Sequence, residues 1–348
     1  MKLMLLHTAR QARPTTDIER FALLADTLQG CGVQILNEYV QNQEELTHNL
    51  RQFNPDMVFA SDYYLENAAG QRSNIHQLLE EAHTPYIGSS AETLELVLSK
   101  VALKRKWQEN GVITPDGFWA TRDPQTDQLD EAIEAAEYPY LLKPNREGNS
   151  RGLDESSIVF NQLQLERKAN ALLQEYPGVL VEKYLGIINE LREFTVAMIG
   201  NQGNRLLMPA EITLKAKKKL RLITTRDKDE HFTLAEPVRD EILKHNLSEF
   251  AEKAFDVANV RDYARCDILM VKHKFYAIEI NGQPMIPDRW FETCSYSQEL
   301  SEKQYLPAIV LAAIERYRLT GDVDWPIPPQ LYEHLPQSAL ESLVHSAN

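Results

Sequence analysis

The chain has 348 residues, of which 43% are hydrophobic and 25% are charged, and its formal net charge is −14. This length allows two or three subdomains around a large core. The acidic balance argues against nucleic acid or an anionic membrane as a partner, because both need a broad basic surface. The cysteines Cys31, Cys266 and Cys294 are far apart and form no CxxC pair, which is typical of a reducing compartment. The apolar run at the amino terminus is too short for a signal peptide, so we expect a cytoplasmic protein.

Residues 1–111 alternate strand-like apolar runs with helical patterns. The expected strands are KLMLLHT, VQILNEYV, DMVFASDYY and PYIGSS, and the expected helices are DIERFALLADTLQG, NQEELTHNLRQF and NIHQLLEEA. Such alternation predicts a doubly wound parallel sheet. One long helix from about Ala91 to Asn110, ended by Gly111, then leads out of this amino-terminal domain.

Three further segments follow. Residues 112–195 predict a small central α+β subdomain with the strands FWAT, PYLLKPN, SSIVF and VLVEKYL and two helices. Residues 196–318 predict a carboxy-terminal subdomain with the strands FTVAMIGN and RLLMPAEIT, a helix from about Pro237 to Ala258, and a hairpin. Residues 319–348 form a Pro-containing tail.

The hairpin reads RCDILMVKHKFYAIEIN over residues 265–281. If its turn is centred on His273, Asp267 lies opposite Glu279 and Arg265 lies opposite Asn281, all on one face. The apolar face would then hold the even-numbered residues Ile268, Met270, Tyr276, Ile278 and Ile280. Two carboxylates within roughly 5 Å repel each other unless a cation lies between them. The cluster therefore indicates either an Mg²⁺ site completed by phosphates or a solvent-exposed face of alternating charge.

A second candidate site is YLLKPNREGNSRG, at Tyr140–Gly152. Here Lys143 offers an ammonium group, Gly148 and Gly152 let the backbone approach an anion, and Ser150 adds a hydroxyl. The GxxxxGK[ST] pattern is absent. The stretch indicates a polyphosphate-binding loop, with an ordinary turn carrying incidental charges as the alternative.

Other residues fit a nucleotide site only when taken together. Lys100 could reach the same phosphates, the backbone of Glu182–Leu185 could bind an adenine edge, and Glu193 could accept hydrogen bonds from ribose hydroxyls. For each of them, a solvated lysine or an ordinary strand position is the alternative.

The order of these elements resembles the ATP-grasp ligases, in particular their D-alanine–D-alanine ligase-like branch. The resemblance covers residues 1–318 and is carried by KPNREGNSRG, VEKYL, REFTVAMIG, ARCD and EIN. It implies an α/β ATP-grasp fold with three subdomains: an amino-terminal doubly wound domain, a central α+β domain, and a carboxy-terminal α+β domain with an antiparallel sheet. It also implies ATP and two Mg²⁺ ions, for which Mn²⁺ can substitute, and a homodimer.

The resemblance assigns a role to each matching residue. Arg265 would face the transition-state oxyanion, and Ser150 matches the second serine of the phosphate loop, with Asn149 in place of the first. The implied metal ligands are Asp267, Glu279 and Asn281. The implied ATP contacts are Lys100, Lys143, Glu182, Lys183, Tyr184, Leu185, Glu193 and, from the basic segment KAKKKLR, Lys215 or Lys217.

The resemblance further implies that ATP phosphorylates a carboxylate and an amine then displaces the phosphate. The sequence departs from the branch at HTARQARPTTDIE, SDYYLENAAGQRSN and GQPMIPDRWFE, where both substrate pockets are expected. We therefore hypothesise a specialised amino-acid ligase of secondary metabolism, for example one that joins serine or threonine to mycosporine-glycine. The alternatives are a D-alanine–D-alanine ligase with divergent pockets, an ATP-binding regulator without turnover and, least favoured, a nucleic-acid-binding module built on KAKKKLR.

Overall fold

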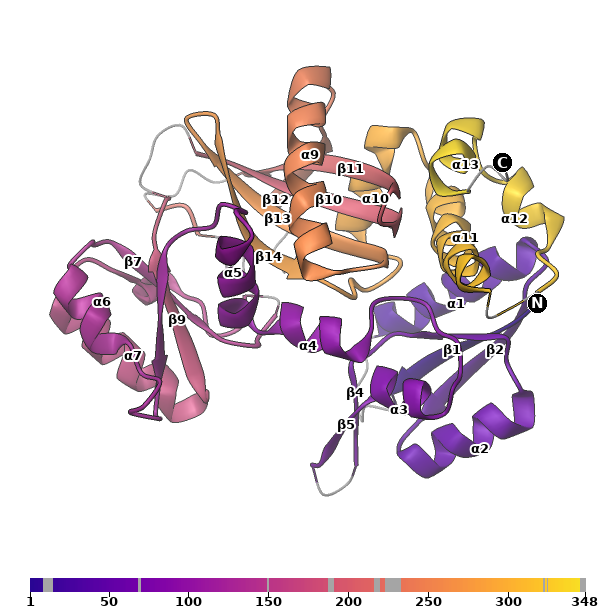
Figure 1. Ribbon diagram of the computed structural model, residues 1–348, viewed down its shortest axis with the longest axis horizontal. Helices are drawn as coiled ribbons and strands as arrows, with labels where there is room; N and C mark the ends of the chain where they lie inside the picture. Colours follow the sequence, from indigo (N-terminus) through magenta and orange to yellow (C-terminus); the bar gives the residue numbers. More distant parts are fainter. Residues whose placement is uncertain are drawn as a thin grey trace.

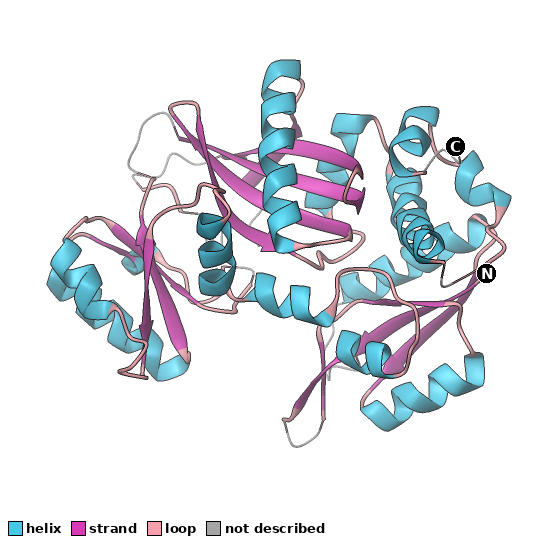
Figure 2. Cartoon of the chain, in the orientation of Figure 1, coloured by secondary structure: helices cyan, strands magenta, loops and turns pink. Residues whose placement is uncertain are grey.

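In the described residues, three sheets of three to five strands, each with helices packed on it, and one two-stranded hairpin make up the fold (Figures 1 and 2). The structure is a computed structural model that describes residues 1–8, 15–67, 70–148, 150–186, 191–215, 220–222, 233–321, 323 and 325–344. The expected α/β architecture, with parallel and antiparallel sheets, is confirmed. Within those residues, no helix has both the length and the apolar character needed to cross a bilayer.

The amino-terminal part contains a parallel sheet in the order β2-β1-β3. Its strands are β1 (Lys2–Thr8), β2 (Gln34–Val40) and β3 (Met57–Ala60). Its helices are α1 (Thr15–Gly30), α2 (Gln43–Phe53) and α3 (Ile75–Glu81). The run DMVFASDYY is not one strand, because β3 ends at Ala60 and a short hairpin of β4 (Tyr64–Glu66) and β5 (Arg72–Asn74) follows. The expected strand PYIGSS is reduced to one bridge between Tyr86 and Val58.

The helix that we expected to run unbroken from Ala91 to Asn110 is two helices, α4 (Ala91–Leu98) and α5 (Lys100–Glu109). Ser99 has an extended backbone between them, and its hydroxyl accepts a hydrogen bond from the Ala102 amide at 3.3 Å. Serine is a favoured residue at a helix amino terminus, and here it ends one helix and begins the next. The break places Lys100 at the first position of α5.

The central part is an antiparallel sheet in the order β6-β9-β7-β8. The strands are β6 (Gly117–Thr121), β7 (Tyr140–Pro144), β8 (Ile158–Val159) and β9 (Gly178–Lys183). The helices α6 (Leu129–Ala135) and α7 (Gln162–Glu175) cover it, and a 3₁₀ turn, η1 (Glu155–Ser157), precedes β8. β7 and β9 are adjacent, which brings Lys143 and Glu182 close together.

The carboxy-terminal sheet is antiparallel in the order β12-β11-β10-β13-β14. Its strands are β10 (Leu191–Asn201), β11 (Asn204–Leu214), β12 (Thr233–Pro237), β13 (Asp262–Val271) and β14 (Lys274–Asn281). Side chains of β10 alternate between its faces: Val196 packs with α9 (Glu241–Ala258), and Ala197 packs with α11 (Glu302–Thr320). The expected boundary at residue 195 falls inside β10.

The tail folds back onto the molecule. After α10 (Arg289–Ser295), the 3₁₀ turn η2 (Tyr296–Gln298) and α11, the chain forms α12 (Pro329–Glu333) and α13 (Gln337–Leu343). Their buried residues join the core that α11 shares with β1 and α1, and these residues are Leu331, Leu335, Ala339 and Leu343. The tail is therefore part of the hydrophobic core.

Candidate active site

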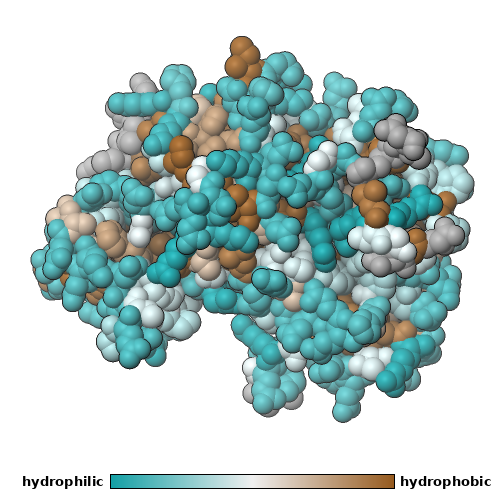
Figure 3. Space-filling model, viewed as in Figure 1, coloured by the Kyte–Doolittle hydropathy of each residue, from teal (hydrophilic) through white to brown (hydrophobic). Residues whose placement is uncertain are grey.

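The residues predicted from the sequence come from three directions: the corner between α4 and α5, the central sheet, and one face of the carboxy-terminal sheet. The view in Figure 3 shows a mainly hydrophilic surface that is recessed between the lobe bearing α6 and α7 and the lobe bearing α2 and α3. Ion pairs connect the three groups, because α5 contributes Lys100 to a pair with Glu279 and Lys104 to a pair with Glu182.

The hairpin of β13 and β14 has the predicted cross-strand pairs, Asp267 opposite Glu279 and Arg265 opposite Asn281. The turn, however, is not centred on His273. Lys272 and His273 both have positive φ, 47° and 69°, and form a two-residue turn between Val271 and Lys274.

A bulge restores the predicted pairing. The register shifts between Asp267 and Ile268, because Ile268 pairs with Ala277 and leaves Ile278 as an extra residue before Glu279. The apolar face consequently differs from the prediction. Ala277 is buried with Ile268, Met270 and Ile280, whereas Tyr276 and Ile278 are only partly buried.

Arg265 and Asp267 contact each other and their neighbours on the polar face. Asp267 Oδ1 accepts a hydrogen bond from Thr195 Oγ1 at 2.7 Å and lies 3.5 Å from Arg265 Nε. Arg265 also donates from Nη1 to Asp288 Oδ2 at 3.2 Å, and its guanidinium lies 5.5 Å from the ring centroid of Trp290. Burial alone would lower the pKa of Arg265, but Asp267 and Asp288 outweigh it, so the guanidinium keeps its charge.

Glu182 lies between two lysines in the interior. Its Oε1 pairs with Lys143 Nζ, and its Oε2 lies 3.1 Å from Lys104 Nζ. Lys104 also donates to Thr114 Oγ1 at 2.5 Å. Exposed fractions of 9% for Lys143, 3% for Glu182 and 4% for Lys104 show that water screens these charges little.

Opposite charges keep this buried group ionised. Burial would raise the pKa of Glu182, but Lys104 and Lys143 outweigh it and hold the pKa below the usual carboxyl value. Burial would lower the pKa of Lys143, yet Glu182 and Glu279 raise it above the usual value. Lys104, which was not predicted from the sequence, has a lowered pKa because its burial is the largest effect. Its position beside buried Leu103 and Trp107 on α5 was the available signal.

Lys100 connects the phosphate loop to the hairpin. Its Nζ lies 3.1 Å from Glu279 Oε2 and donates to the carbonyl oxygen of Glu147 at 2.7 Å. Ser150 has a left-handed backbone with φ of 58°, and Gly152 likewise has φ of 73°. Asn149 lies outside the described residues. The geometry thus brings Lys100, Lys143 and the loop to the edge of the acidic cluster.

The expected adenine-binding segment continues from Glu182 at the end of β9. Lys183 donates through Nζ to the carbonyl oxygen of Glu137, and Tyr184 is buried with its hydroxyl donating to the carbonyl oxygen of Arg221 at 2.9 Å. Leu185 is partly buried.

The two remaining ATP contacts lie on the carboxy-terminal sheet. Glu193 is on β10, and its Oε2 lies 3.5 Å from Arg221 Nε. Lys215 is exposed just after β11, and Lys217 lies outside the described residues.

The donor chemistry suits a hard cation with additional ligands. Asp267, Glu279 and Asn281 present carboxylate and amide oxygens, which Mg²⁺ prefers. Among the described residues, no group of three or more Asp, Glu, His or Cys side chains could hold a metal. Phosphate oxygens and water would therefore have to complete the coordination, as expected when the metal arrives with a nucleotide.

A polar cluster lies where β1 ends, near the expected first-substrate pocket. The buried ring of His7 stacks on Phe21 with centroids 3.7 Å apart and makes hydrogen bonds with Ser61 Oγ at 3.0 Å and Asn37 Oδ1 at 2.6 Å. A space of about 10 Å³ lies beside it, bounded also by Tyr263 and Met285. Residues 9–14, which carry most of the altered segment after β1, lie outside the described residues.

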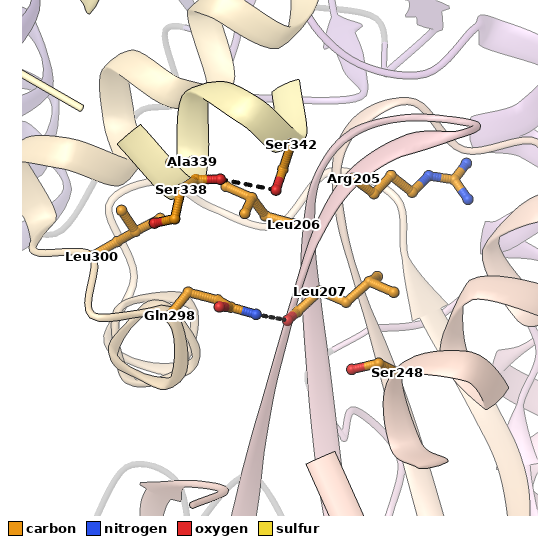
Figure 4. A pocket seen from close by; sticks show the side chains of 9 residues that line it. All are labelled: Arg205, Leu206, Leu207, Ser248, Gln298, Leu300, Ser338, Ala339 and Ser342. Atoms are coloured by element: carbon orange, nitrogen blue, oxygen red, sulfur yellow. Dashed lines mark hydrogen bonds between the residues drawn. The ribbon is translucent and has the colours of Figure 1, made fainter. Parts of the chain in front are cut away.

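A cavity of about 250 Å³ lies elsewhere, between β11, α9, η2 and α13 (Figure 4). Its lining includes three serines, Ser248, Ser338 and Ser342. The Arg205 guanidinium points away from it and pairs with Asp256. None of the predicted site residues lines this cavity.

The chain matches known proteins over most of its length. The family model described as "D-ala D-ala ligase C-terminus" matches residues 108–303. A D-alanine–D-alanine ligase of Aquifex aeolicus is 27% identical over 285 residues, which cover 82% of this chain and 90% of the relative. One of Carboxydothermus hydrogenoformans is 24% identical over 288 residues, covering 79% and 87%.

Solved structures show the same fold. The D-alanine–D-alanine ligase of Bacillus anthracis in complex with ATP superposes with a TM-score of 0.73 at 17% identity, covering 92% of this chain and all of that one. The VanG D-Ala:D-Ser ligase of Enterococcus faecalis gives 0.67 at 15% identity, covering 90% and 99%. The family model spans more than half of the chain and contains the phosphate loop, β9 and the acidic hairpin. The chain therefore belongs to the D-alanine–D-alanine ligase family of ATP-grasp enzymes, which form carbon–nitrogen bonds.

Proposed function

We propose that the protein is an ATP- and Mg²⁺-dependent ligase that joins a carboxylate or carbonyl donor to an amine through a phosphorylated intermediate and forms an amide or an imine-type bond. The observation that carries this proposal is the polar face of the hairpin. Asp267 and Glu279 lie opposite each other on this face, with Arg265 beside Asp267 and Lys100 beside Glu279. Family membership makes a metal-bound nucleotide the simplest reason for keeping two carboxylates there.

In the proposed reaction with a carboxylate donor, a carboxylate oxygen of the first substrate attacks the γ-phosphorus and ADP leaves. The amine nitrogen of the second substrate then attacks the acyl carbon, phosphate leaves, and the nitrogen loses a proton. With a carbonyl donor, the enol form of the carbonyl would be phosphorylated instead, and the amine would replace its oxygen, which leaves as phosphate, to give an imine-type bond. Lys100, Lys143 and Ser150 would hold the phosphates, while Arg265 would face the oxyanion that forms at the acyl carbon. Bound Mg²⁺, held by Asp267, Glu279 and Asn281, would neutralise phosphoryl charge.

Glu182–Leu185 and Glu193 would bind the adenosine, and Lys215 or Lys217 would add a phosphate contact. Lys143 pairs with Glu182 in this structure, so it would have to move from this carboxylate towards the nucleotide. Lys104 would then remain as the counter-ion of Glu182.

Two substrate assignments have equal support. The names of the relatives favour D-alanine as both substrates. The altered segments SDYYLENAAGQRSN and GQPMIPDRWFE favour a specialised ligase of secondary metabolism, such as one that joins serine or threonine to mycosporine-glycine. For either one we propose a cytoplasmic homodimer.

The test is phosphate release from ATP with Mg²⁺, screened with D- and L-amino acids singly and in pairs, and with mycosporine-glycine as the donor. A specific donor and amine pair that stimulates release, with a stoichiometric amide or imine product, would support the proposal and identify the substrates. Glu279→Gln should abolish the stimulation. Nucleotide binding without stimulation by any pair would favour the alternative of an ATP-binding regulator.

A further inference from the structure

The β4–β5 hairpin contacts α4 through two polar side chains. Tyr64 and Asn74 are cross-strand partners at the base of this hairpin. The Tyr64 hydroxyl donates to Glu95 Oε1, and Asn74 Nδ2 donates to the same oxygen at 3.1 Å. The Asn74 side chain is also held by α3, because its Oδ1 caps the start of this helix and accepts a hydrogen bond from the Gln77 amide at 3.2 Å.

Glu95 also contacts the phosphate loop, so it connects the β4–β5 hairpin to this loop. Its other oxygen, Oε2, pairs with Arg146 Nη2, and the same guanidinium nitrogen donates to the Tyr64 hydroxyl at 3.4 Å. Burial would raise the pKa of Glu95, but Tyr64 and Arg146 outweigh it and lower the pKa, so the carboxylate remains charged. Arg146 immediately follows Asn145 in the loop and has a left-handed backbone with φ of 68°. A non-glycine residue needs compensating contacts to hold this conformation.

The neighbours of Arg146 contact the same helical corner. Asn145 Nδ2 donates to Ser99 Oγ at 3.3 Å, and Lys100 Nζ donates to the Glu147 carbonyl oxygen at 2.7 Å. Three successive loop residues are thus held by α4, Ser99 and α5. Of the three contacts, only the one at Arg146 extends to the β4–β5 hairpin.

We propose that Tyr64, Asn74 and Glu95 are positioning residues that act through Arg146 to fix the start of the phosphate loop. Tyr64 and Asn74 belong to SDYYLENAAGQRSN, a stretch in which this chain departs from the family pattern. The hairpin thus supplies two of the side chains that hold Glu95, and through it Arg146, in place. The inference rests on the proposed function only in that the loop binds nucleotide phosphates.

A preorganised loop pays less conformational entropy when phosphates bind, so its loss should weaken phosphate binding selectively. The experiment compares the affinities of AMP-PNP with Mg²⁺ and of AMP, by calorimetric titration of the full chain. Arg146→Ala should weaken AMP-PNP binding about tenfold and Tyr64→Phe about fivefold, as expected for one charge-assisted hydrogen bond. AMP affinity should stay within about twofold, because AMP lacks the phosphates that the loop would hold.

Three further variants separate positioning from general damage. Tyr64→Phe combined with Arg146→Ala should bind AMP-PNP no more weakly than Arg146→Ala alone, because both act through one contact. Arg146→Lys should recover part of the affinity. Arg72→Ala, which removes an exposed 3.0 Å pair with Glu66 on the same hairpin, should match the wild type.

Three results would each overturn the positioning role. The first is an unchanged AMP-PNP affinity in Arg146→Ala, and the second is a double variant in which the losses of the two single variants add up. The third is an equal loss of affinity for AMP and AMP-PNP. A wild-type protein that does not bind AMP-PNP would instead overturn the proposed function itself.

Discussion

Lys104 is a counter-ion of Glu182, a carboxylate that is only 3% exposed to water. It lies 3.1 Å from Glu182 and is itself 4% exposed. Removing one partner of a buried ion pair leaves an uncompensated charge, which costs more than the pair contributes. In the proposed function, Lys104 would remain the counter-ion of Glu182 when Lys143 moves to a phosphate.

Lys104→Met should accordingly lower the free energy of unfolding by about 3 kcal/mol at neutral pH, as measured by urea denaturation. The aliphatic stem is retained, so the loss reports the charge rather than a cavity. Arg105→Met, at an exposed position of the same helix, should change stability by less than about 0.5 kcal/mol. Equal stability of Lys104→Met and the wild type would show that Lys143 alone compensates Glu182.

His76 is a buried residue that should make stability depend on pH. Its ring nitrogens have no hydrogen-bond partner among the described residues, and burial, with Arg261 nearby, lowers its pKa to about 3. The unfolded ring titrates near the ordinary value of about 6.5, so between these values the unfolded chain binds the extra proton. The stabilisation is thus complete above about pH 6.5 and is lost as the pH falls towards 3.

From this residue we expect a loss of about 2 kcal/mol between about pH 7 and pH 5, measured by chemical unfolding at each pH. His76→Leu should remove this part of the pH dependence. His48→Gln, at an exposed position, should retain it. The same pH dependence in His76→Leu and the wild type would mean that other groups cause the acid sensitivity.

At the level of elements, the β13–β14 hairpin combines a tight turn with a bulge. The turn residues Lys272 and His273 have positive φ, which favours glycine or asparagine. His273→Gly should therefore raise the free energy of unfolding by about 0.5–1 kcal/mol. The same replacement at exposed His245, inside α9, should lower it by about 1 kcal/mol. Destabilisation by both replacements would contradict the assigned turn conformation.

The prediction from sequence succeeded at this hairpin through two compensating errors. The first error was the turn, which we centred on His273 and which is in fact one residue shorter. The second was the missed bulge at Ile278, which adds one residue and so restores the pairing of Asp267 with Glu279. Alternation of polar and apolar residues reveals which residues share a face, but a bulge leaves no clear mark in such a pattern. For this reason Ala277 was missed as a core residue.

Two further errors, at Ser99 and at Lys104, have different causes. Helical periodicity continues across Ser99, so the break between α4 and α5 could be identified only from the serine cap. The apolar neighbours Leu103 and Trp107 hint that Lys104 is buried, but they do not reveal its partner, because Glu182 lies 78 positions further along the chain. Contacts between such distant residues have no periodic signal.

At the scale of the molecule, the carboxy-terminal tail packs against β1, α1 and α11 and shares one hydrophobic core with them. Leu331 is fully buried in a cluster that includes Leu3 of β1 and Leu311 of α11. Its Pro-rich surroundings predicted only an extension of unknown role, because the few apolar residues of a tail do not reveal what they pack against. The order of sequence blocks, in contrast, predicted the overall fold correctly.

Leu331→Ala should lower the free energy of unfolding by about 2–4 kcal/mol, since it deletes buried methyl groups and leaves a cavity. The measurement is denaturant unfolding of the full chain. Glu333→Ala, on the exposed side of the same helix, should have little effect. If both variants unfold like the wild type, the tail does not stabilise the core.

The most direct test of the central claim, that the acidic hairpin holds a metal-bound nucleotide, needs no knowledge of the substrates. We would measure the affinity for AMP-PNP with and without Mg²⁺ in the wild type and in the double variant Asp267→Asn with Glu279→Gln. The account predicts that Mg²⁺ strengthens binding to the wild type at least about tenfold and has little effect on the variant. Binding that is independent of Mg²⁺ in the wild type, or equally dependent on it in the variant, would contradict the account.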